Sequence, residues 1–409
     1  MSELAFYLQP RPAYEPIRTQ GNHFWRNDER FLIKGINYFK WKRNANVSNS
    51  RWRDSTVLDA LADEQLDELR EDVKVLQELG MNTILVSCLD ITKDHYAAFR
   101  LLAENGIYVV VEVGGFARSM SISNDHLNED TDLNEFYRAE MLQNDFRLMH
   151  QLAHYENVLG FMVSGDVLNS RQRTRLAPIV RAFVRDARAF LRVRGGRRVP
   201  TGMSNPQVME LRMSALQYFT AGSVDERVDF FAQQNYSWCS PSSFQISGWK
   251  NMVENLQRND VCVPMFLAEF GCNTNARTWD EITCLYSRDM LGLFSGGCVY
   301  CYEEFGNGYG LVKRDDKGRL ARKPESDLLK RRLLASKGTS NAATHEVEVK
   351  DYESWQGDFP SEGRRKVWLA GRTLPNCPID LHSFALELKD KDERERDLVH
   401  RTEGLHIDE

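Results

Sequence analysis

The sequence predicts an α/β protein, a (β/α)8 TIM barrel followed by a charged carboxyl-terminal tail. Short apolar segments alternate with segments of helical spacing between residues 31 and 336, and eight of the apolar segments read as strands. This alternation favours parallel strands joined by right-handed crossovers. Eight such units in about 300 residues fit one closed barrel. An open doubly wound sheet is the alternative, but no GxGxxG-type loop follows the first strand.

Each element is predicted from a local pattern. An amino-terminal arm of mixed polar and aromatic residues precedes the first strand, at residues 31–39. Leucine and valine then recur at helical spacing over residues 66–79, and Gly80 ends that helix. The later strands are expected at 82–89, 107–113, 158–165, 199–204, 230–238, 263–271 and 297–302, and the clearest later helices at 94–104, 134–154, 176–194 and 280–293.

The end of the chain has a different composition. Residues 337–409 contain few apolar runs, and residues 389–396 are all charged. A segment of this kind buries too little apolar surface to offset its ordering entropy, so we expect a charged, partly disordered tail. The predicted organisation is an arm (1–30), a catalytic-type barrel (31–336) and the tail (337–409).

The bulk composition excludes several classes of protein. The chain has 409 residues, 42% of them hydrophobic and 27% charged, as in ordinary globular proteins. A net charge of -6 argues against a nucleic-acid or anionic-membrane partner. No apolar run approaches the length of a membrane span, and the ends resemble neither a secretory signal nor a lipid-anchor signal. The sequence as written therefore predicts a cytoplasmic protein.

The eight cysteines do not indicate a metal site. Cys298 and Cys301 have C-x-x-C spacing, but they are predicted to lie in a strand, where residues three apart point to opposite faces. No second cysteine or histidine pair completes a zinc site. We therefore expect no metal and no cofactor.

Two acidic residues end predicted strands. The apolar run 263–268 stops at Glu269 and is followed by Gly271, while the fourth strand leads into Asp166. In a barrel both would lie at the carboxyl-terminal rim, where chemistry is done. Two carboxylates there can cleave a glycosidic bond by the retaining route. Taken singly, each acid is better explained as a helix cap, a surface turn residue or an ion-pair partner.

The chain resembles the fungal β-1,3-glucanosyltransferases of glycoside hydrolase family 72 from about residue 31 to residue 335. Four blocks carry the resemblance in order: QNYSWC at 234–239, FLAEFGCN at 266–273, FSGG at 294–297 and NGYGLV at 307–312. The resemblance implies remodelling of cell-wall glucan, with a β-1,3-glucan oligosaccharide as partner. It also implies a cell-surface location as the alternative to the cytoplasm.

The resemblance assigns roles to individual residues. It makes Glu269 the nucleophile and puts Asp166 at the acid/base position. Residues expected to hold the sugar chain are Tyr38, Tyr236, Tyr300, Tyr309 and Asn235. Tyrosine suits this role because its ring packs on sugar C–H groups while its hydroxyl bonds a sugar oxygen.

The chain also departs from the family pattern. Gly165-Asp166 stands where the family has Asn-Glu, and a carboxyl one methylene shorter is retracted by roughly 1.5 Å. Three other cleft positions carry Phe39, Leu85 and Ser87 in place of Gln, Arg and Tyr. Three family cysteines are replaced by Leu69, Ala98 and Ala221, while Cys239 and Cys272 remain and could pair.

These observations leave two hypotheses for the function. The first is a retaining transglycosylase or hydrolase that uses Glu269 and Asp166. The second is a catalytically impaired pseudoenzyme that binds glucan or a protein partner, which the changed cleft residues would explain.

Overall fold

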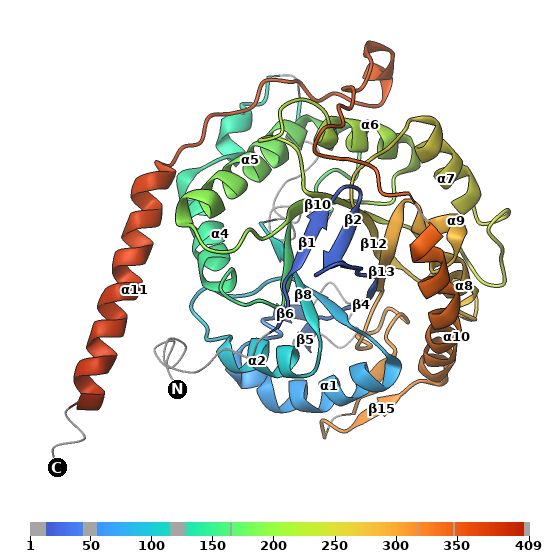
Figure 1. The fold of residues 1–409 in the computed structure, drawn as a ribbon, viewed down its shortest axis with the longest axis horizontal. Coiled ribbons are helices and arrows are strands. Elements are labelled where there is room, and N and C mark those ends of the chain that lie inside the picture. The colour runs from blue at the N-terminus through green and yellow to red at the C-terminus, as the bar shows by residue number, and fades with distance from the viewer. Residues whose placement is uncertain are drawn as a thin grey trace.

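The computed structural model describes residues 14–43, 55–114, 127–128, 130–163, 166–315, 317–346 and 348–404. Eight parallel strands close into a barrel in the order β10-β11-β12-β13-β4-β7-β8-β9 (Figure 1). The predicted fold class is confirmed. The barrel strands are β4 (Ile33–Asn37), β7 (Thr83–Val86), β8 (Tyr108–Val113), β9 (Val158–Val163), β10 (Thr201–Asn205), β11 (Phe230–Gln234), β12 (Met265–Phe270) and β13 (Phe294–Val299).

Helices form the outer ring around these strands (Figure 1). The first begins and ends at the predicted residues, and Gly80 takes the left-handed conformation that ends it (φ 79°). Among the described residues, the helices of the ring are α1 (Leu66–Leu79), α2 (Tyr96–Glu104), α4 (Ala139–Leu152), α5 (Ala177–Arg194), α6 (Met209–Thr220), α7 (Trp249–Arg258), α8 (Asp280–Leu285), α9 (Arg288–Leu291) and α10 (Pro324–Glu346). None of the described helices combines the length and the apolar character that a membrane span requires.

Strand alternation divides the core into two layers. Inside the barrel, Phe230, Phe266 and other apolar side chains form one buried cluster. Side chains on the opposite faces of the strands pack against the helices in a second, larger cluster. The interior is crowded, because a Cβ on Gly202 would lie only 2.4 Å from the Phe230 ring. Only glycine fits that position.

The described part of the amino-terminal arm forms a small antiparallel sheet, made of β1 (Ile17–Gln20), β2 (His23–Arg26) and β3 (Glu29–Arg30). Phe24 from this sheet packs on Phe230 and Phe266, with ring centroids 5.8 and 6.0 Å apart. The sheet therefore closes the end of the barrel where the strands begin, which leaves the other end for a site. Two further hairpins are β5 (Lys40–Arg43) with β6 (Ser55–Leu58) and β14 (Val312–Arg314) with β15 (Leu320–Arg322).

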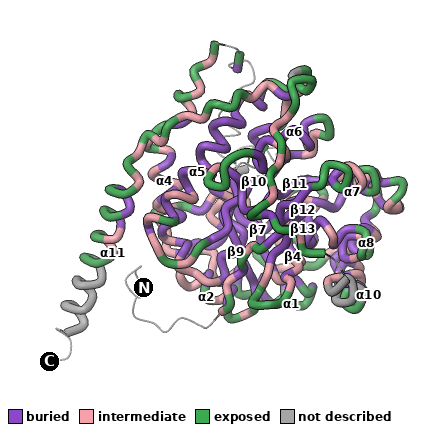
Figure 2. Tube along the Cα trace, turned by 45° about the horizontal axis from the view of Figure 1, so that its top comes forward, coloured by how far each residue is buried: buried purple, intermediate pink, exposed green. Residues whose placement is uncertain are grey.

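Residues 348–404 belong to the segment predicted to be a charged, partly disordered tail, and the structure describes them. Residues 348–380 run along the barrel wall, where the Tyr218 hydroxyl donates to the Gly371 carbonyl (2.7 Å). Helix α11 (Leu381–Gly404) then packs on α5 through the buried side chains of Phe384, Ala385 and Leu388. In Figure 2 the first part of α11 shows buried segments among exposed and intermediate ones. A few apolar residues in a charged segment thus suffice to dock it.

Candidate active site

Glu269 ends the apolar part of β12 and lies at the open end of the barrel. Strict alternation would put its side chain on the same face as Leu267, toward the helices. Between these residues the pairing with β11 slips by one position, so that Gln233 pairs with Leu267 but Gln234 pairs with Glu269. A bulge of this kind changes the direction of a side chain and is common beside active sites. Here it brings Glu269 to the tyrosines and the acid described next.

The surroundings of Glu269 make its carboxyl group unusually basic. The Tyr236 hydroxyl donates a hydrogen bond to Oε2 (2.7 Å). Burial, followed by the charges of Asp166 and Glu112, raises the pKa of Glu269 to about 8, while the hydrogen bonds from Tyr236 and Gln234 oppose the rise. Burial outweighs the two donors, because removing a carboxylate from water is costly.

Asp166 lies just beyond β9, at the same end of the barrel. Gln234 Nε2 donates to its Oδ1 (3.0 Å). The residue is exposed as a whole, yet the surrounding protein desolvates the carboxyl and raises its pKa, against the Gln234 hydrogen bond and the Arg173 charge. Gln234 also lowers the pKa of Glu269, so its amide lies near both carboxyls.

Three tyrosines surround Glu269. The ring centroids of Tyr236, Tyr300 and Tyr309 lie 5.3 to 6.2 Å apart, in edge-to-face pairs. Burial raises the pKa of all three hydroxyls, so the phenols stay protonated and can donate hydrogen bonds. Behind them, the buried Arg277 guanidinium donates to the Tyr300 carbonyl (3.1 Å) and the Tyr309 carbonyl (2.7 Å). The three tyrosines are therefore half-buried, and the hydrogen bonds from Arg277 hold the backbone of two of them in place.

A disulfide connects the two strand ends that carry Tyr236 and Glu269. Cys239 lies three residues after Tyr236, Cys272 lies three residues after Glu269, and the two cysteines are joined with their Cα atoms 5.0 Å apart. The pairing expected from the resemblance is therefore present. It links the β11 and β12 loops directly beside the carboxyl pair.

The family model of the glucanosyltransferases, glycoside hydrolase family 72, matches residues 8–334. The chain belongs to the glucanosyltransferase family. It is 36% identical to the 1,3-beta-glucanosyltransferase gel1 of Aspergillus fumigatus over 334 residues, which cover 82% of this chain and 68% of the relative. It is 34% identical to the 1,3-beta-glucanosyltransferase GAS5 of Saccharomyces cerevisiae over 372 residues, or 88% of this chain and 70% of the relative.

A solved structure of the same family has a similar fold. The Saccharomyces cerevisiae protein Gas2p, in complex with laminaritetraose and laminaripentaose, superposes with a TM-score of 0.73 at 27% identity. The match covers 90% of this chain and 75% of that chain. The predicted family is thus confirmed.

The structure brings most of the predicted site residues together, but not all of them. Glu269, Asp166 and the three tyrosines form one group. Tyr38 is fully buried on the helix side of β4, and its hydroxyl donates to Asp72 of α1 (2.7 Å). Asn235 is also buried, where its amide contacts Met252 Sδ (3.2 Å) and its Oδ1 accepts from the Ser237 hydroxyl (2.7 Å). These two residues support the site from outside the barrel.

Sequence reasoning missed three residues of the glucanosyltransferase site. Gln234 bonds Asp166 and lies near Glu269, Glu112 near the end of β8 adds a third negative charge, and Arg277 holds the tyrosines. Gln234 and Glu112 could have been found by counting in steps of two from the buried interior residues of β11 and β8. Arg277 has no comparable signal, since it lies in a loop.

The structure describes most of the residues at which the chain departs from the family pattern, but not all of them. Phe39 lies with its ring centroid 6.1 Å from that of Tyr300, at the edge of the tyrosine cluster. Leu85 and Ser87 are both buried, with 2% and 3% of their surface exposed. Gly165 lies outside the described residues. Leu69, Ala98 and Ala221 are buried in the outer core, so small or apolar side chains fill the places of the lost cysteines.

Replacing Glu269 by glutamine is expected to stabilise the folded protein at neutral and alkaline pH. The carboxyl keeps its proton up to about pH 8 when folded but loses it near 4.5 when unfolded. As the pH rises from 4.5 to 8, the wild type therefore loses stability that the variant keeps. We expect a difference of about 1–3 kcal/mol above pH 8, below the roughly 1.4 kcal/mol per pKa unit because the group is partly exposed.

Urea unfolding of both proteins at acid and alkaline pH measures this difference. An equal difference at about pH 4 and pH 8.5 would contradict the assignment of a raised pKa.

Proposed function

We propose that this protein is a retaining β-1,3-glucan transglycosylase that remodels cell-wall glucan, with Glu269 as nucleophile and Asp166 as acid/base. The observation that supports this most is the proximity of the two carboxyls. After burial, the Asp166 charge is the largest cause that raises the pKa of Glu269, and Gln234, which bonds Asp166, also acts on Glu269. The retaining route needs carboxyls separated by about 5–5.5 Å, whereas the inverting route needs about 6.5–9.5 Å.

The reaction follows from this arrangement. A Glu269 oxygen attacks the anomeric carbon, and the electron pair of the breaking C–O bond moves to the leaving oxygen, which takes a proton from Asp166. The product is a glycosyl ester on Glu269 with Asp166 ionised. Asp166 then removes a proton from the acceptor hydroxyl, whose oxygen attacks the anomeric carbon and displaces Glu269. Both carboxyls return to their first state.

The electrostatics of the pair suit this sequence of steps. One proton must be shared between the two carboxyls at the start of the reaction. Their pKa values are both raised, so loss of the last proton is deferred toward pH 8. Neighbouring acids that interact strongly titrate as a unit. The reactive form is the one with the proton on Asp166 and the charge on Glu269, where Tyr236 donates a hydrogen bond to it.

The tyrosine cluster supplies a surface for the glucan chain. The faces of Tyr300 and Tyr309 can pack on the C–H groups of glucose units, and their protonated hydroxyls can bond sugar oxygens. The adjacent Phe39 extends this apolar edge. Exclusion of water by such a surface favours a sugar acceptor over hydrolysis.

We place the protein at the cell surface, not in the cytoplasm. The Cys239–Cys272 disulfide beside the active site supports this, because disulfides persist in oxidising compartments. The relatives are named 1,3-beta-glucanosyltransferases, and the glucan of the cell wall is the polymer we expect this protein to remodel.

Incubation of the purified protein with reduced laminari-oligosaccharides tests the proposal. Products both longer and shorter than the substrate are expected from transfer, and shorter products alone would indicate hydrolysis. No change of chain length at high enzyme concentration, together with calorimetric binding of the oligosaccharide, would favour the pseudoenzyme. The residues that favour that alternative are Leu85 and Asp166.

Asp166→Glu is expected to raise the transfer rate, by up to about a hundredfold. The longer side chain moves the carboxyl by roughly 1.5 Å toward the position it has in the family pattern. A misplacement of about 1 Å can cost this much. Initial rates of transfer on laminari-oligosaccharides measure the gain, and a slower variant would show that the cleft is fitted to aspartate.

A further inference from the structure

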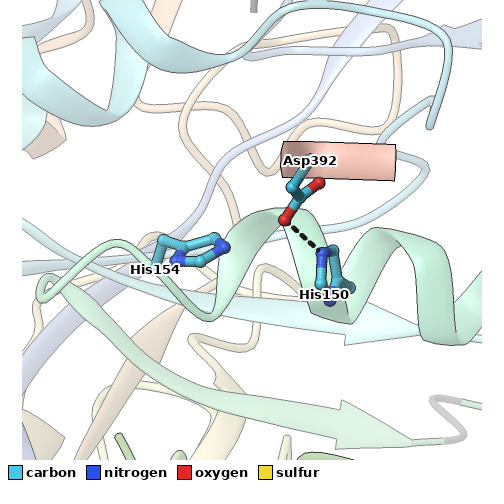
Figure 3. Close-up of side chains that lie close together, drawn as sticks. All are labelled: His150, His154 and Asp392. Atoms are coloured by element: carbon cyan, nitrogen blue, oxygen red, sulfur yellow. Dashed lines mark hydrogen bonds and ion pairs between the residues drawn. The ribbon is translucent and has the colours of Figure 1, made fainter. Parts of the chain in front are cut away.

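Two histidines and one aspartate gather on the outer wall of the barrel, away from the glucan site. His150 belongs to the last turn of α4, His154 lies two residues beyond that helix, and Asp392 comes from α11. One possible ligand atom from each residue lies within 4.8 Å of the others. Figure 3 shows the two imidazoles on successive turns, with Asp392 above and between them. The cluster thus joins two segments that are more than 230 residues apart.

We propose that His150, His154 and Asp392 bind a divalent transition-metal ion of the zinc type, which fastens α11 to the barrel. Two imidazoles and one carboxylate are a ligand set suited to zinc, with a fourth position left for water. Histidines four residues apart lie on one helix face, so one ion can reach both rings. Imidazole does not suit Mg²⁺ or Ca²⁺, which prefer oxygen ligands.

The geometry needs only small adjustments to bind an ion. Zinc–nitrogen and zinc–oxygen distances of about 2.0–2.2 Å place neighbouring ligand atoms roughly 3.3–3.5 Å apart. His150 Nε2 and Asp392 Oδ2 are 2.9 Å apart, and the largest separation allowed in the cluster is 4.8 Å. Side-chain movements that shift the ligand atoms by about an ångström would bring these separations to the values that zinc requires.

The location favours a cation. His150 and His154 lie at the carboxyl-terminal end of α4, where the helix dipole is negative. A cavity of about 680 Å³ adjoins the cluster and has room for a metal-bound water. Three cations also line this cavity. Lys93 pairs with Glu64, the Arg147 guanidinium lies over the Phe384 ring at 5.3 Å, and Lys391 is an exposed residue of α11.

The metal would lengthen the attachment of α11. The buried apolar contacts of this helix come from Phe384, Ala385 and Leu388, near its beginning. Asp392 is one helical turn further on, so an ion there extends the attached part of α11 by about 6 Å. The site lies close to the start of β9, at the end of the barrel opposite to the catalytic rim. A metal ion at this end of the barrel is expected to stabilise the fold and to take no part in the reaction.

The alternative explanation of the cluster is a hydrogen bond between His150 and Asp392 with no metal ion. The His154→Ala variant distinguishes this hydrogen bond from a metal site. This variant keeps the bonded pair but lacks one metal ligand. Calorimetric titration of the chelator-treated full chain with Zn²⁺ should show one site, while Mg²⁺ should give no binding. Zinc affinity should fall more than about tenfold in His154→Ala and in Asp392→Asn, because even the loss of an outer partner costs about 10–100-fold.

Two matched controls lie on α11 itself. His382→Ala removes an exposed histidine and Asp390→Asn removes an exposed carboxylate, so both should bind Zn²⁺ like the wild type. Absence of saturable Zn²⁺ binding in the wild type, or unchanged affinity in His154→Ala, would overturn the site.

Trypsin digestion tests the fastening separately. Lys389 and Lys391 are cleavage points in α11, and Zn²⁺ should slow cleavage there in the wild type but not in Asp392→Asn. If Zn²⁺ binds but the rate of cleavage in the wild type is unchanged, the fastening of α11 is refuted. Neither experiment depends on glucan or on the residues of the carboxyl pair.

Discussion

The Glu269→Gln variant is expected to lose glucan transfer almost completely, by at least about 10⁴-fold. Glutamine has nearly the same shape and can still accept a hydrogen bond from the Tyr236 hydroxyl, but it cannot form the glycosyl ester. The loss should appear in kcat/KM for every oligosaccharide length, because the missing atom takes part in bond formation. Rates measured with reduced laminari-oligosaccharides check this.

Glu281→Gln is the matched control. Glu281 in α8 is also buried, and burial raises its pKa to about 7. The side chains that act on its pKa include Asp280, Arg277 and Ser240. We expect this variant to stay within about tenfold of the wild type. Residual activity above about one hundredth of the wild-type rate in Glu269→Gln would refute the nucleophile, provided that the variant binds glucan.

The fold was predictable because its helices and its strands have different apolar patterns. Helix α1 repeats its leucines at helical spacing, and the barrel strands are short apolar runs. Helix α6 has a weak sequence pattern because eight of its twelve residues are buried. One of them, Tyr218, contacts Trp368 and Phe359 from the carboxyl-terminal segment. A helix that is buried on more than one side lacks the one-sided apolar pattern from which a helix is predicted in a sequence.

The site was predictable in its acids and less so in its supporting residues. A carboxylate at the end of an apolar strand is visible in a sequence, and the family resemblance gave it a role. The direction of a side chain is not visible in the same way. Tyr38 and Asn235 follow directly after residues that face the barrel interior, and the strand period of two turns both outward.

Glu269 is the opposite case. Alternation alone would direct it outward, and it reaches the site because the β11–β12 register slips beside it. Such a slip depends on the packing of both strands and has no signature in either one. The carboxyl pair therefore depends on a tertiary feature that only coordinates reveal.

Asp166→Asn is expected to reduce transfer from laminari-oligosaccharides by about 10²–10⁴-fold, the usual contribution of a general acid. The asparagine amide can still contact Gln234 but cannot protonate the leaving oxygen. An aryl β-glucoside with an acidic phenol leaves without a proton, so we expect a much smaller loss in its release step. Comparison of the two substrates measures the proton-transfer role directly.

Asp225→Asn supplies the control for the change of charge. Asp225 is exposed and paired with Arg192 (2.8 Å), in the loop before β11 at the closed end of the barrel. It should leave both substrates unaffected. Equal losses on the two substrates in Asp166→Asn would mean that Asp166 only holds Gln234 in place. In that case Gln234 would position Glu269 alone, and Glu112, the other carboxylate that raises the pKa of Glu269, would be the next candidate for the proton donor.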